Sequence, residues 1–343
     1  MRRFLVMFLC CMLCLSTALA DVTVNISFAG DVTLGSEEKK RNQETSFVSM
    51  VEKMGYEYFF AHVKDFFATD DLTVVNLEGV LSDSAKGENT KKTYRFRGAP
   101  EYTEILKLGN VEVVTVANNH TQDFGERGYN DTLMALQRAG LNAFGNKMVY
   151  TYEKDGVKLA FISMNSTTFY PNRKWARVEI PRLKAEEGVD AVIFVVHAGS
   201  EYSKKHTALQ SDYAHTAIDM GADLVVMHHP HVVQGIEIYN NRSIVYSIGN
   251  FCFGGNKDVR AIETMVLKAE LTFADDGTYK GQQLSLYPAH ISGTQEYNDY
   301  QPRFVTGDAA REVLRLVQID TKFDLPPYNE ETGCATLDYL PVQ

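Results

Sequence analysis

A histidine-rich segment late in the chain most restricts how the chain can fold. The apolar residues 224–227 predict a buried strand, which ends at His228, His229, Pro230 and His231. Three imidazoles in four residues are costly to bury unless a metal ion or a carboxylate holds them, and α/β sheets place their chemistry at strand ends. Pro230 favours extended backbone before it, which predicts that His229 and His231 share a direction while His228 points away. The alternative is a solvated histidine-rich loop.

The overall composition is that of an acidic globular protein. Of the 343 residues, 45% are hydrophobic and 23% are charged, and the formal net charge is −10. No long basic stretch occurs, which argues against nucleic acid as a partner and against electrostatic adhesion to anionic lipid. A protein with this charge that handles an anionic substrate needs local positive charge, either from metal ions or from a few arginines.

The first twenty residues have the pattern of a secretory signal peptide. Two arginines precede an apolar run at 4–15, and a cleavage site of the A-x-A type ends at Ala20. We therefore expect cleavage before Asp21 and an exported protein, which is secreted, periplasmic or held at the cell surface. A retained N-terminal anchor is the alternative, although the apolar run is short for a membrane span.

Removal of residues 1–20 leaves two cysteines, Cys252 and Cys334. They could pair in an exported protein or remain two separate thiols. The mature chain contains no CxxC motif, which excludes a cysteine-ligated zinc site. Because the sequence has no internal repeat, low-complexity linker or composition break, we expect one domain at 21–320, followed by a C-terminal tail at 321–343.

Strand-like apolar runs alternate with helical patterns along the chain, which predicts an α/β fold with a largely parallel sheet. Tight turns at 240–241 and 276–277 predict two hairpins. The predicted strands are 22–29, 72–77, 111–116, 157–164, 191–196, 224–227, 234–239, 243–247, 263–273 and 279–287, and the predicted helices are 47–67, 100–107, 128–139, 206–220 and 308–317.

Metal-capable side chains follow five of these strands. The carboxyl ends of parallel strands meet at one edge of a sheet, so these side chains are expected to converge. Carboxylate, amide and imidazole ligands together suit one or two divalent ions such as Mn, Fe or Zn. Two such ions can activate water and hold a phosphoryl or acyl oxygen during hydrolysis. The residues concerned are Asp31, Glu78, Asn119, His120, His197, His229 and His231.

Six motifs occur in an order that resembles a known family. They are FAGDVTLG, VVNLEG, VANNHTQDFGERG, HAGSEY, HHPHVVQGIEIY and VYSIGNFCF. The sequence resembles the CapA-type capsule-synthesis proteins, which are named for poly-γ-glutamate and belong to the calcineurin-like metallophosphoesterase superfamily. The resemblance covers Asn25 to about Phe253, with a continuation through Val317. It implies a four-layer α/β/β/α sandwich of the metallo-dependent phosphatase type, with a metal site at strand ends.

The resemblance also implies roles for individual residues. His120 matches the histidine that acts as general acid or phosphate contact, and Glu78 takes the position of the bridging acidic ligand. This chain departs from the pattern of its relatives in three places: Thr33 stands where a ligand histidine is usual, Glu78 replaces an aspartate, and Met227 stands where many relatives have glycine before the histidine pair. The departure at Thr33 puts full metal occupancy and phosphatase activity in question. The implied metal ligands are Asp31, Glu78, Asn119, His197, His229 and His231.

Further residues are candidates for substrate contact or for positioning the ligands. The guanidinium groups of Arg95 or Arg97 are predicted to contact a substrate anion, since an arginine fork binds carboxylate or phosphate with two hydrogen bonds. The alternative is that both are surface arginines on an edge strand. Asp123 is predicted to fix the tautomer of His120 by accepting its other ring proton, which makes it part of the catalytic pair. Asn118 and Asn250 are further candidates for substrate binding, and Glu201, Tyr202 and His228 are candidates for orienting the ligands, with Glu201 and Tyr202 expected beside His197.

The sequence therefore favours an exported CapA-like protein that acts as a metal-dependent hydrolase on a phosphoester or an anionic polymer. Poly-γ-glutamate or another cell-envelope polymer is the substrate that the resemblance implies. The alternative is a non-catalytic scaffold with the same fold, which supports a membrane-bound polymer synthase. A periplasmic solute-binding protein is a weaker alternative, because solute binding does not need histidines at several strand ends.

Overall fold

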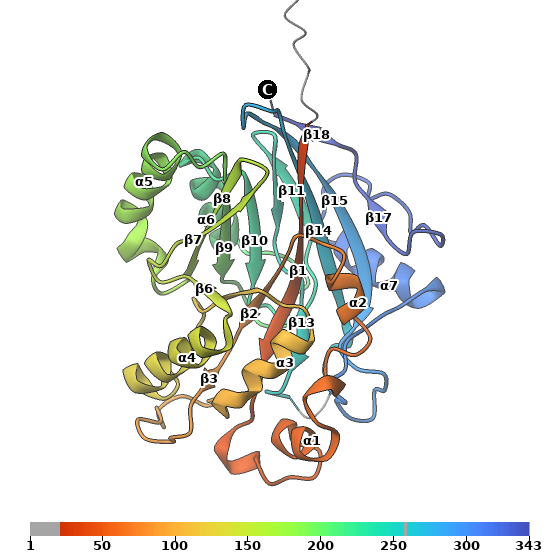
Figure 1. Cartoon of the computed structure of the whole chain (residues 1–343). Coiled ribbons are helices and arrows are strands. Elements are labelled where there is room, and N and C mark those ends of the chain that lie inside the picture. Colours follow the sequence, from red (N-terminus) through yellow and green to blue (C-terminus); the bar gives the residue numbers. More distant parts are fainter. Residues whose placement is uncertain (1–20, 257–258, 343) are drawn as a thin grey trace, which may run out of the picture.

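The computed structural model describes residues 21–256 and 259–342, and the predicted signal peptide, residues 1–20, lies outside this described part. The chain forms a mixed α/β fold with two large β-sheets and flanking helices (Figure 1). The α/β class predicted from the alternation of strands and helices is therefore confirmed. Within 21–256 and 259–342, no helix has the length and apolar character that a membrane span requires.

The larger sheet contains ten strands and is centred on the first strand of the chain. Its strands are β1 (Val22–Thr33), β2 (Leu72–Leu77), β5 (Val113–Thr115), β6 (Asn142–Phe144), β13 (Asn250–Phe253), β14 (Glu263–Phe273), β15 (Tyr279–His290), β16 (Arg303–Phe304), β17 (Ala335–Thr336) and β18 (Leu340–Pro341). Strand β1 is parallel to β2 and β13 and antiparallel to β14. The parallel series continues through β5 and β6, so several strand ends point the same way.

The smaller sheet contains six strands, four of which are parallel. Its order is β11 (Ile236–Tyr239), β12 (Arg242–Val245), β10 (Leu224–His228), β9 (Ala191–His197), β8 (Val157–Asn165) and β7 (Tyr150–Lys154). Strands β8, β9, β10 and β12 are parallel, and β8, β9 and β10 are predominantly apolar and buried, as expected for strands covered on both faces. A two-stranded sheet pairs β3 (Val80–Leu81) with β4 (Arg97–Gly98).

The main hydrophobic core contains side chains of both large sheets. Phe28 and Val74 of the larger sheet pack with Phe161 and Ile193 of the smaller one. The helices are α1 (Phe47–Met54), α2 (Lys64–Phe67), α3 (Thr103–Leu108), α4 (Gly125–Ala139), α5 (Phe169–Glu186), α6 (Ala208–Asp219) and α7 (Gly307–Gln318), with 3-10 turns η1 (Glu38–Lys40), η2 (Tyr56–Tyr58) and η3 (Pro100–Tyr102). Alternate residues of β9 belong to a second cluster, which also contains residues of α5 and α6. In a third cluster, the helices α1, α2, α3 and α4 pack against the larger sheet.

Several elements differ from the sequence predictions, and three of the differences have a local cause or consequence. The helix predicted at 47–67 is broken into α1, η2 and α2, because Gly55 has a φ of 76° and ends α1. Helix α5 was not predicted, and it contains Pro181. Strand β1 was predicted to end at residue 29 but continues to Thr33. It runs so close to the loop before β13 that a Cβ on Gly30 would lie 2.1 Å from the Gly249 carbonyl oxygen.

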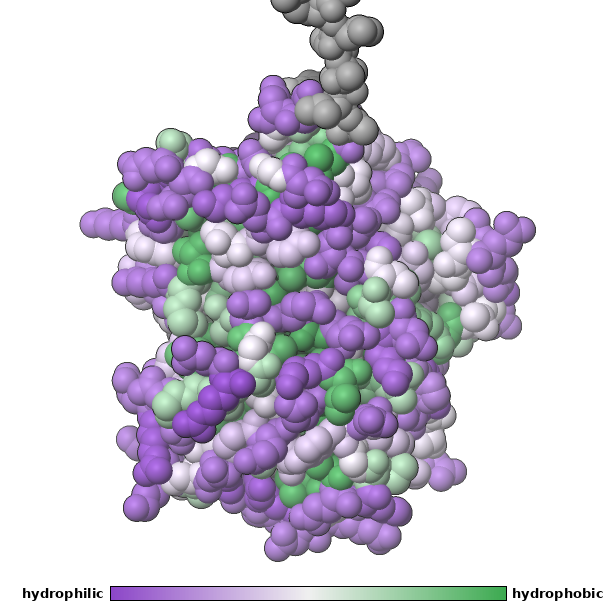
Figure 2. All heavy atoms as spheres, viewed as in Figure 1, coloured by the Kyte–Doolittle hydropathy of each residue, from purple (hydrophilic) through white to green (hydrophobic). Residues whose placement is uncertain are grey.

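The segment 321–342, which the sequence set apart as a tail, contributes to the larger sheet. Strands β17 and β18 both pair with β15, and Leu337 belongs to the main core. Cys252 and Cys334 are both buried and free, as the alternative of two separate thiols predicted. On the face seen in Figure 2, apolar residues occur as small groups among a predominantly polar surface.

Candidate metal centre

The candidate ligands lie where strand ends of the two large sheets meet. Asp31 lies within β1, and Asn76 of β2 is its partner in the register of the parallel pair. In the smaller sheet His197 ends β9 and is paired in register with His228, the last residue of β10. Each sheet therefore delivers side chains from neighbouring parallel strands to the same region.

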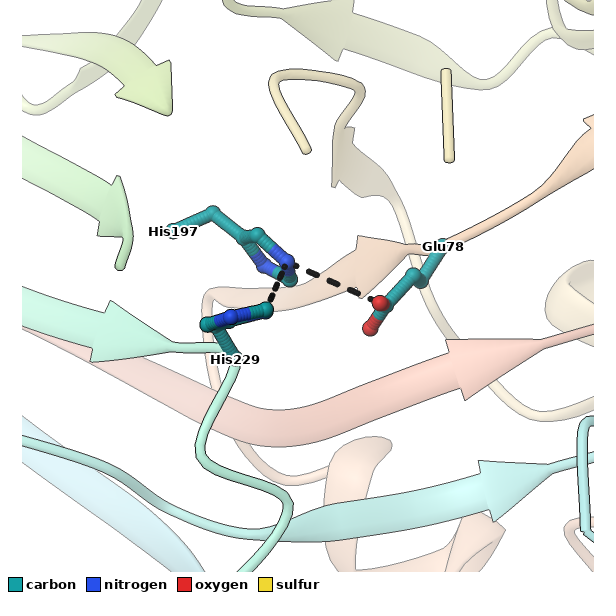
Figure 3. A group of neighbouring side chains, drawn as sticks. All are labelled: Glu78, His197 and His229. Atoms are coloured by element: carbon teal, nitrogen blue, oxygen red, sulfur yellow. Dashed lines mark hydrogen bonds and ion pairs between the residues drawn. The ribbon is translucent and has the colours of Figure 1, made fainter. Parts of the chain in front are cut away.

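Two groups of possible ligands form there, and they share one glutamate. The first consists of Glu78, His197 and His229, shown in Figure 3, and the second of Asp31, Glu78 and His231. Within each group the ligand atoms lie within 4.8 Å of one another. Two nitrogen or oxygen ligands of one ion lie at most about 4.4 Å apart, so small side-chain shifts would bring all three atoms within reach of one ion.

The buried carboxylate of Glu78 is at the centre of the cluster. Its Oε1 accepts no hydrogen bond in the described part of the chain, although it is fully buried. Around this oxygen lie Nε2 of His197 at 3.6 Å, Nε2 of His120 at 3.8 Å and Nε2 of His231 at 4.0 Å. An unpartnered carboxylate oxygen surrounded by ring nitrogens is a costly arrangement that a cation would satisfy. The residues present therefore fit a divalent metal ion.

Asn119 and His229 complete the side of the cluster nearest His197. Oδ1 of Asn119 lies 2.7 Å from Nε2 of His197, and Nδ1 of His229 lies 3.1 Å from the same nitrogen. The structure thus brings together Asn119, His197 and His229, which come from three separate strand ends. The grouping agrees with their predicted role as ligands.

His228 lies inside the cluster, and the prediction that it points away is wrong. Its Nδ1 is 3.3 Å from Oδ1 of Asp31, and Nδ1 of His231 is 3.2 Å from Oδ2. The prediction assumed extended backbone at His229, whereas its φ is 101°, and the φ of His231 is 59°. Positive φ is rare for residues other than glycine and costs about 1–3 kcal/mol each, and such strain concentrates at functional sites.

Burial and mutual charge separate the pKa values of these groups. Burial together with the charge of Asp31 raises the pKa of Glu78 well above its usual value. Burial would also raise the pKa of Asp31, but His228 and His231 lower it well below the usual range. Burial lowers the pKa of His231, yet Glu78 and Asp31 outweigh it and raise the pKa to about 9. Protons on Glu78 and His231 thus supply the positive charge that a bound cation would supply at the same place.

His197 and His229 are neutral at physiological pH, as metal ligands must be. Burial and the positive charge of His231 lower the pKa of His229 to about 4. Burial and His229 lower the pKa of His197 well below its usual value. A neutral imidazole keeps a lone pair for a metal ion, so these shifts favour ligation.

His120 lies beside the ligands and is held by Asp123. The Nδ1 atom of His120 is 2.6 Å from Oδ2 of Asp123, which also accepts a hydrogen bond from the Phe96 backbone N–H. Lys92 pairs with the other carboxylate oxygen of Asp123 and donates to the Asn119 carbonyl. The contact between His120 and Asp123 has the geometry expected from the sequence, with Nε2 left to face Glu78.

Two buried residues that the sequence analysis did not assign hold this arrangement. Asn76 donates to Oδ1 of Asp31 and lies 3.2 Å from Nδ1 of His197. Thr33 is also buried, and its hydroxyl donates to the Glu78 carbonyl oxygen, so it fixes the backbone of that residue. Asn76 could have been found, since it is polar in an otherwise apolar strand and has the same side-chain direction as Glu78.

The two predicted substrate arginines are neutralised by other acids. Arg95 pairs with Glu88 at 2.8 Å. Arg97 is almost completely buried and contacts Glu38 at 2.5 Å, while its guanidinium also donates to the Ser82 carbonyl. The structure therefore does not bring these guanidinium groups into the ligand cluster, and their contact with substrate remains a prediction.

The other predicted residues lie at the edges of the cluster. Oδ1 of Asn250 is 2.8 Å from Nδ1 of His231. The side chain of Asn118 donates to Asn76 and to the Leu77 carbonyl, which ties the loop before His120 to β2.

Glu201 and Tyr202 had been expected beside His197. They line a hollow together with His120 and His231. The ring of Tyr202 is centred 6.1 Å from that of His231, while the hydrogen-bonding neighbours of His197 are Asn76, Asn119 and His229. The hollow also contains Arg260, which the sequence analysis did not single out.

Residues 25–255 match the family model described as "Bacterial capsule synthesis protein PGA_cap". This match covers more than half of the chain and includes every candidate ligand. The chain belongs to this family. The resemblance to CapA-type proteins that six sequence motifs indicated is thereby confirmed.

Curated proteins of similar sequence include two bacterial CapA proteins. The "PGA biosynthesis protein CapA" of Bacillus subtilis is 29% identical over 253 residues, which cover 68% of this chain and 64% of that protein. The "Capsule biosynthesis protein CapA" of Bacillus anthracis is 26% identical over 254 residues, 67% of this chain and 60% of that one. A "Probable polyglutamine synthesis accessory protein" of Mycobacterium tuberculosis is 26% identical over 65% of this chain and 66% of its own length. The similarity thus spans less than two thirds of the two CapA proteins.

Proposed function

We propose that this protein is an exported, metal-dependent hydrolase with the four-layer α/β/β/α arrangement of the calcineurin-like metallophosphoesterases. The observation that carries the proposal is the pair of ligand groups that share Glu78, with His120 and Asp123 beside them. The common core of the two sheets and the helices that pack on each of them support the fold. The pattern of residues 1–20 supports export.

The proposed substrate is an anionic polymer of the capsule or cell envelope, such as poly-γ-glutamate, or a phosphoester formed during its synthesis. The names of the two Bacillus relatives support this class of substrate. The word "accessory" in the name of the mycobacterial relative supports a membrane-bound polymer synthase as a partner. The net charge of −10 argues against nucleic acid.

Each of the two ligand groups would hold one divalent ion, with Asn119 completing the group that contains His197. The mixture of carboxylate, amide and imidazole suits Mn, Fe or Zn. Divalent ions bound there would supply Lewis-acid stabilisation of a phosphoryl or carbonyl oxygen and lower the pKa of a water molecule. Glu78 belongs to both groups, and bound cations would supply the partner that its buried Oε1 lacks among the described residues.

The chain itself supplies the proton transfer. His120 takes up and releases a proton at Nε2, which faces the cluster 3.8 Å from Glu78. Asp123 accepts the hydrogen bond from Nδ1–H and so fixes the ring and its tautomer. Burial lowers the pKa of His120, and the hydrogen bond to Asp123 partly opposes this effect. In this role His120 protonates the leaving group as the bond breaks.

The non-catalytic scaffold remains a second candidate because of Thr33. Its hydroxyl donates to the Glu78 carbonyl oxygen at 2.7 Å, and a threonine hydroxyl in this role offers no imidazole to the second ion. A centre with one ligand fewer holds one of its ions more weakly. In that case the metal stabilises the fold, and the protein acts by supporting a polymer synthase.

The decisive experiment combines metal analysis with turnover. The mature chain from residue 21 onward is purified, its Mn, Fe and Zn contents are measured, and hydrolysis of bis(p-nitrophenyl) phosphate and of poly-γ-glutamate is assayed. The same measurements are made on Asn119→Ala and His229→Ala, with circular dichroism to check folding. His62→Ala is the matched control, because His62 is exposed and contacts Gln301 away from the cluster.

We expect bound metal in the wild type and in His62→Ala, with metal and turnover both reduced in the two ligand variants. A wild-type protein that binds none of the three metals overturns the hydrolase proposal. Metal bound without turnover of either substrate favours the scaffold.

A further inference from the structure

One exposed arginine shares a hollow with the histidines of the candidate metal centre. His120 and His231 of the candidate metal centre line part of this hollow. Tyr94, Tyr202 and Arg260 are among its other lining residues. The guanidinium of Arg260 lies 5.5 Å from the centre of the Tyr202 ring. This stacking orients a cation without neutralising it.

Arg260 has no acidic partner in the part of the chain that the structure describes. By contrast, Arg95 and Arg97 are each paired with a glutamate. The hydrogen-bonding neighbours of Arg260 are the neutral side chains of Tyr94 and Tyr202, so its positive charge stays available for a carboxylate or phosphate. Among these three arginines, Arg260 is therefore the one that is available for an anion.

Tyr202 is itself fixed to the ligand loop. Its backbone N–H donates to the Pro230 carbonyl oxygen at 2.7 Å, and its φ is 59°, in the left-handed region. Pro230 lies between the two ligand histidines His229 and His231. The Tyr202 ring, and with it the Arg260 guanidinium, is thus held in a fixed relation to the candidate metal centre.

A second hollow of about 330 Å³ shares Tyr202 and Arg260 with the first. Its lining adds Lys204 and the apolar side chains of Val232, Val233 and Leu316. A volume of this size accommodates part of an extended ligand. Arg260 and Tyr202 consequently lie where a chain leaving the metal centre would enter the second hollow.

Two acids limit where an anion can bind. Glu201 lines the first hollow and Glu263 the second. Neither forms an ion pair with Arg260 or Lys204 among the described residues. Like charges repel, so an anionic ligand is favoured near the two cations and disfavoured elsewhere along these walls.

We propose that Arg260, stacked on Tyr202, binds an anionic group of the substrate adjacent to the bond that reacts, and that Lys204 binds the next one along the chain. The ligand chemistry is a linear chain that carries regularly spaced carboxylates or phosphates. The inference rests on the proposed function, because it concerns the substrate of the same metal centre. It adds the direction in which that substrate crosses the protein surface. No covalent step is involved.

The test measures binding separately from turnover. Fluorescein-labelled γ-linked pentaglutamate and labelled linear pentaphosphate are titrated with protein at low salt, and fluorescence anisotropy gives the dissociation constant of each. The variants are Arg260→Gln, Arg260→Lys and Lys204→Gln. Arg182→Gln is the matched control, since it removes a half-buried arginine of α5 that pairs with Glu179 and Glu187.

For at least one probe, we expect Arg260→Gln to weaken binding about three- to tenfold, as loss of a partly exposed charged hydrogen-bonding group does. We expect Arg260→Lys to recover part of this loss and Lys204→Gln to weaken binding about two- to threefold. The probe that is affected distinguishes a carboxylate chain from a phosphate chain. No binding of either probe by the wild type, or equal losses in Arg260→Gln and Arg182→Gln, would overturn the proposal.

Metal content separates this inference from the proposed function. Arg260→Gln should retain the wild-type content of Mn, Fe and Zn and should raise KM more than it lowers kcat. If the wild type binds no metal but binds a probe through Arg260, the hydrolase proposal fails and the binding site stands. If metal and turnover are present but binding does not depend on Arg260, the binding site fails alone.

Discussion

Asn76 connects ligands that come from different sheets. Its side-chain nitrogen donates to Oδ1 of Asp31 at 2.8 Å and lies 3.2 Å from Nδ1 of His197. Its side-chain oxygen accepts a hydrogen bond from Asn118. Asp31 and Asn76 belong to the larger sheet and His197 to the smaller one. This single amide therefore orients a carboxylate and an imidazole toward one another before any ion binds.

Asn76→Ala is expected to weaken metal binding by about 10- to 100-fold, as loss of a group that orients ligands does. It also leaves the Asn118 amide without one partner, which costs about 1–3 kcal/mol of stability. Calorimetric titration of the metal-free protein with Mn²⁺ or Zn²⁺ measures the affinity. Asn142→Ala on the exposed surface of β6 is the control. Wild-type affinity in a folded Asn76→Ala protein would contradict the orienting role.

Asp123 is expected to act on turnover through His120 and not through metal binding. Asp123→Asn removes the charge that holds Nδ1 of His120 at 2.6 Å, so the ring can adopt the wrong tautomer. We predict a fall in kcat of at least about tenfold, with unchanged metal content, measured by hydrolysis assays and elemental analysis. Asp65→Asn, at an exposed position of α2, should leave both unchanged. Loss of metal from Asp123→Asn would instead make Asp123 part of the ligand support.

The sequence predicted most of the cluster because its members follow apolar strands directly. His197, for example, is the last residue of a strand whose apolar run is plain in the sequence. Asn76 was missed because it lies inside such a run, where a polar residue has no local explanation. No pattern in the sequence indicated that Arg260 lies beside the candidate metal centre. Its place beside Tyr202 depends on how two loops far apart in the sequence meet, and no local pattern encodes that.

At the scale of elements, strands were predicted better than helices. Residues 72–77 form β2 as predicted, because a short and mainly apolar segment of this kind is typical of a strand buried on both faces. Helix α5 was missed because Pro171 and Pro181 interrupt its helical pattern. Pro171 is tolerated in the first turn, where its missing N–H has no helical partner, and the packing of Ile180 in the core offsets the cost of Pro181. Tertiary packing of this kind cannot be read from local propensity.

The hairpin between β11 and β12 offers a test of turn chemistry. Asn240 and Asn241 have φ values of 48° and 55°, so both central residues are left-handed, as a type I′ turn requires. Asn241→Gly is expected to change stability by less than about 0.5 kcal/mol, because glycine adopts this conformation without strain but adds entropy to the unfolded chain. Asn241→Ala should destabilise it by about 1 kcal/mol. Urea unfolding measures both, and equal midpoints for the two variants would contradict this account of the turn.

The whole molecule is held together by its shared core and by polar links between distant segments. Asp320 follows α7, and its Oδ2 accepts hydrogen bonds from the backbone N–H groups of His206 and Gly235. It also lies 2.8 Å from Nδ1 of His206. His206 precedes α6, and Gly235 precedes β11 of the smaller sheet. The carboxylate thus ties the C-terminal helix to segments more than eighty residues away.

This link makes stability depend on pH in a defined direction. Burial would raise the pKa of Asp320, but the hydrogen bonds and charge of His206 outweigh it and lower the pKa below the usual 3.8. A carboxyl group with a depressed folded-state pKa stabilises the protein above its unfolded pKa, and this contribution is lost as the pH falls through the folded-state value. The stabilisation by Asp320 is therefore complete at pH 6 and declines below about pH 4.

We expect Asp320→Asn to unfold more easily than the wild type at pH 6, by about 1–3 kcal/mol, as loss of a buried charged acceptor does. The difference between the two proteins should shrink as the pH is lowered from 4 toward 2.5, because the wild-type carboxylate then becomes protonated. Urea unfolding across this pH range measures it. Asp308→Asn is the control on the same helix, since Asp308 is fully exposed and its replacement should leave stability nearly unchanged. A difference that stays constant down to pH 2.5 would mean that shape, and not charge, is what Asp320 contributes.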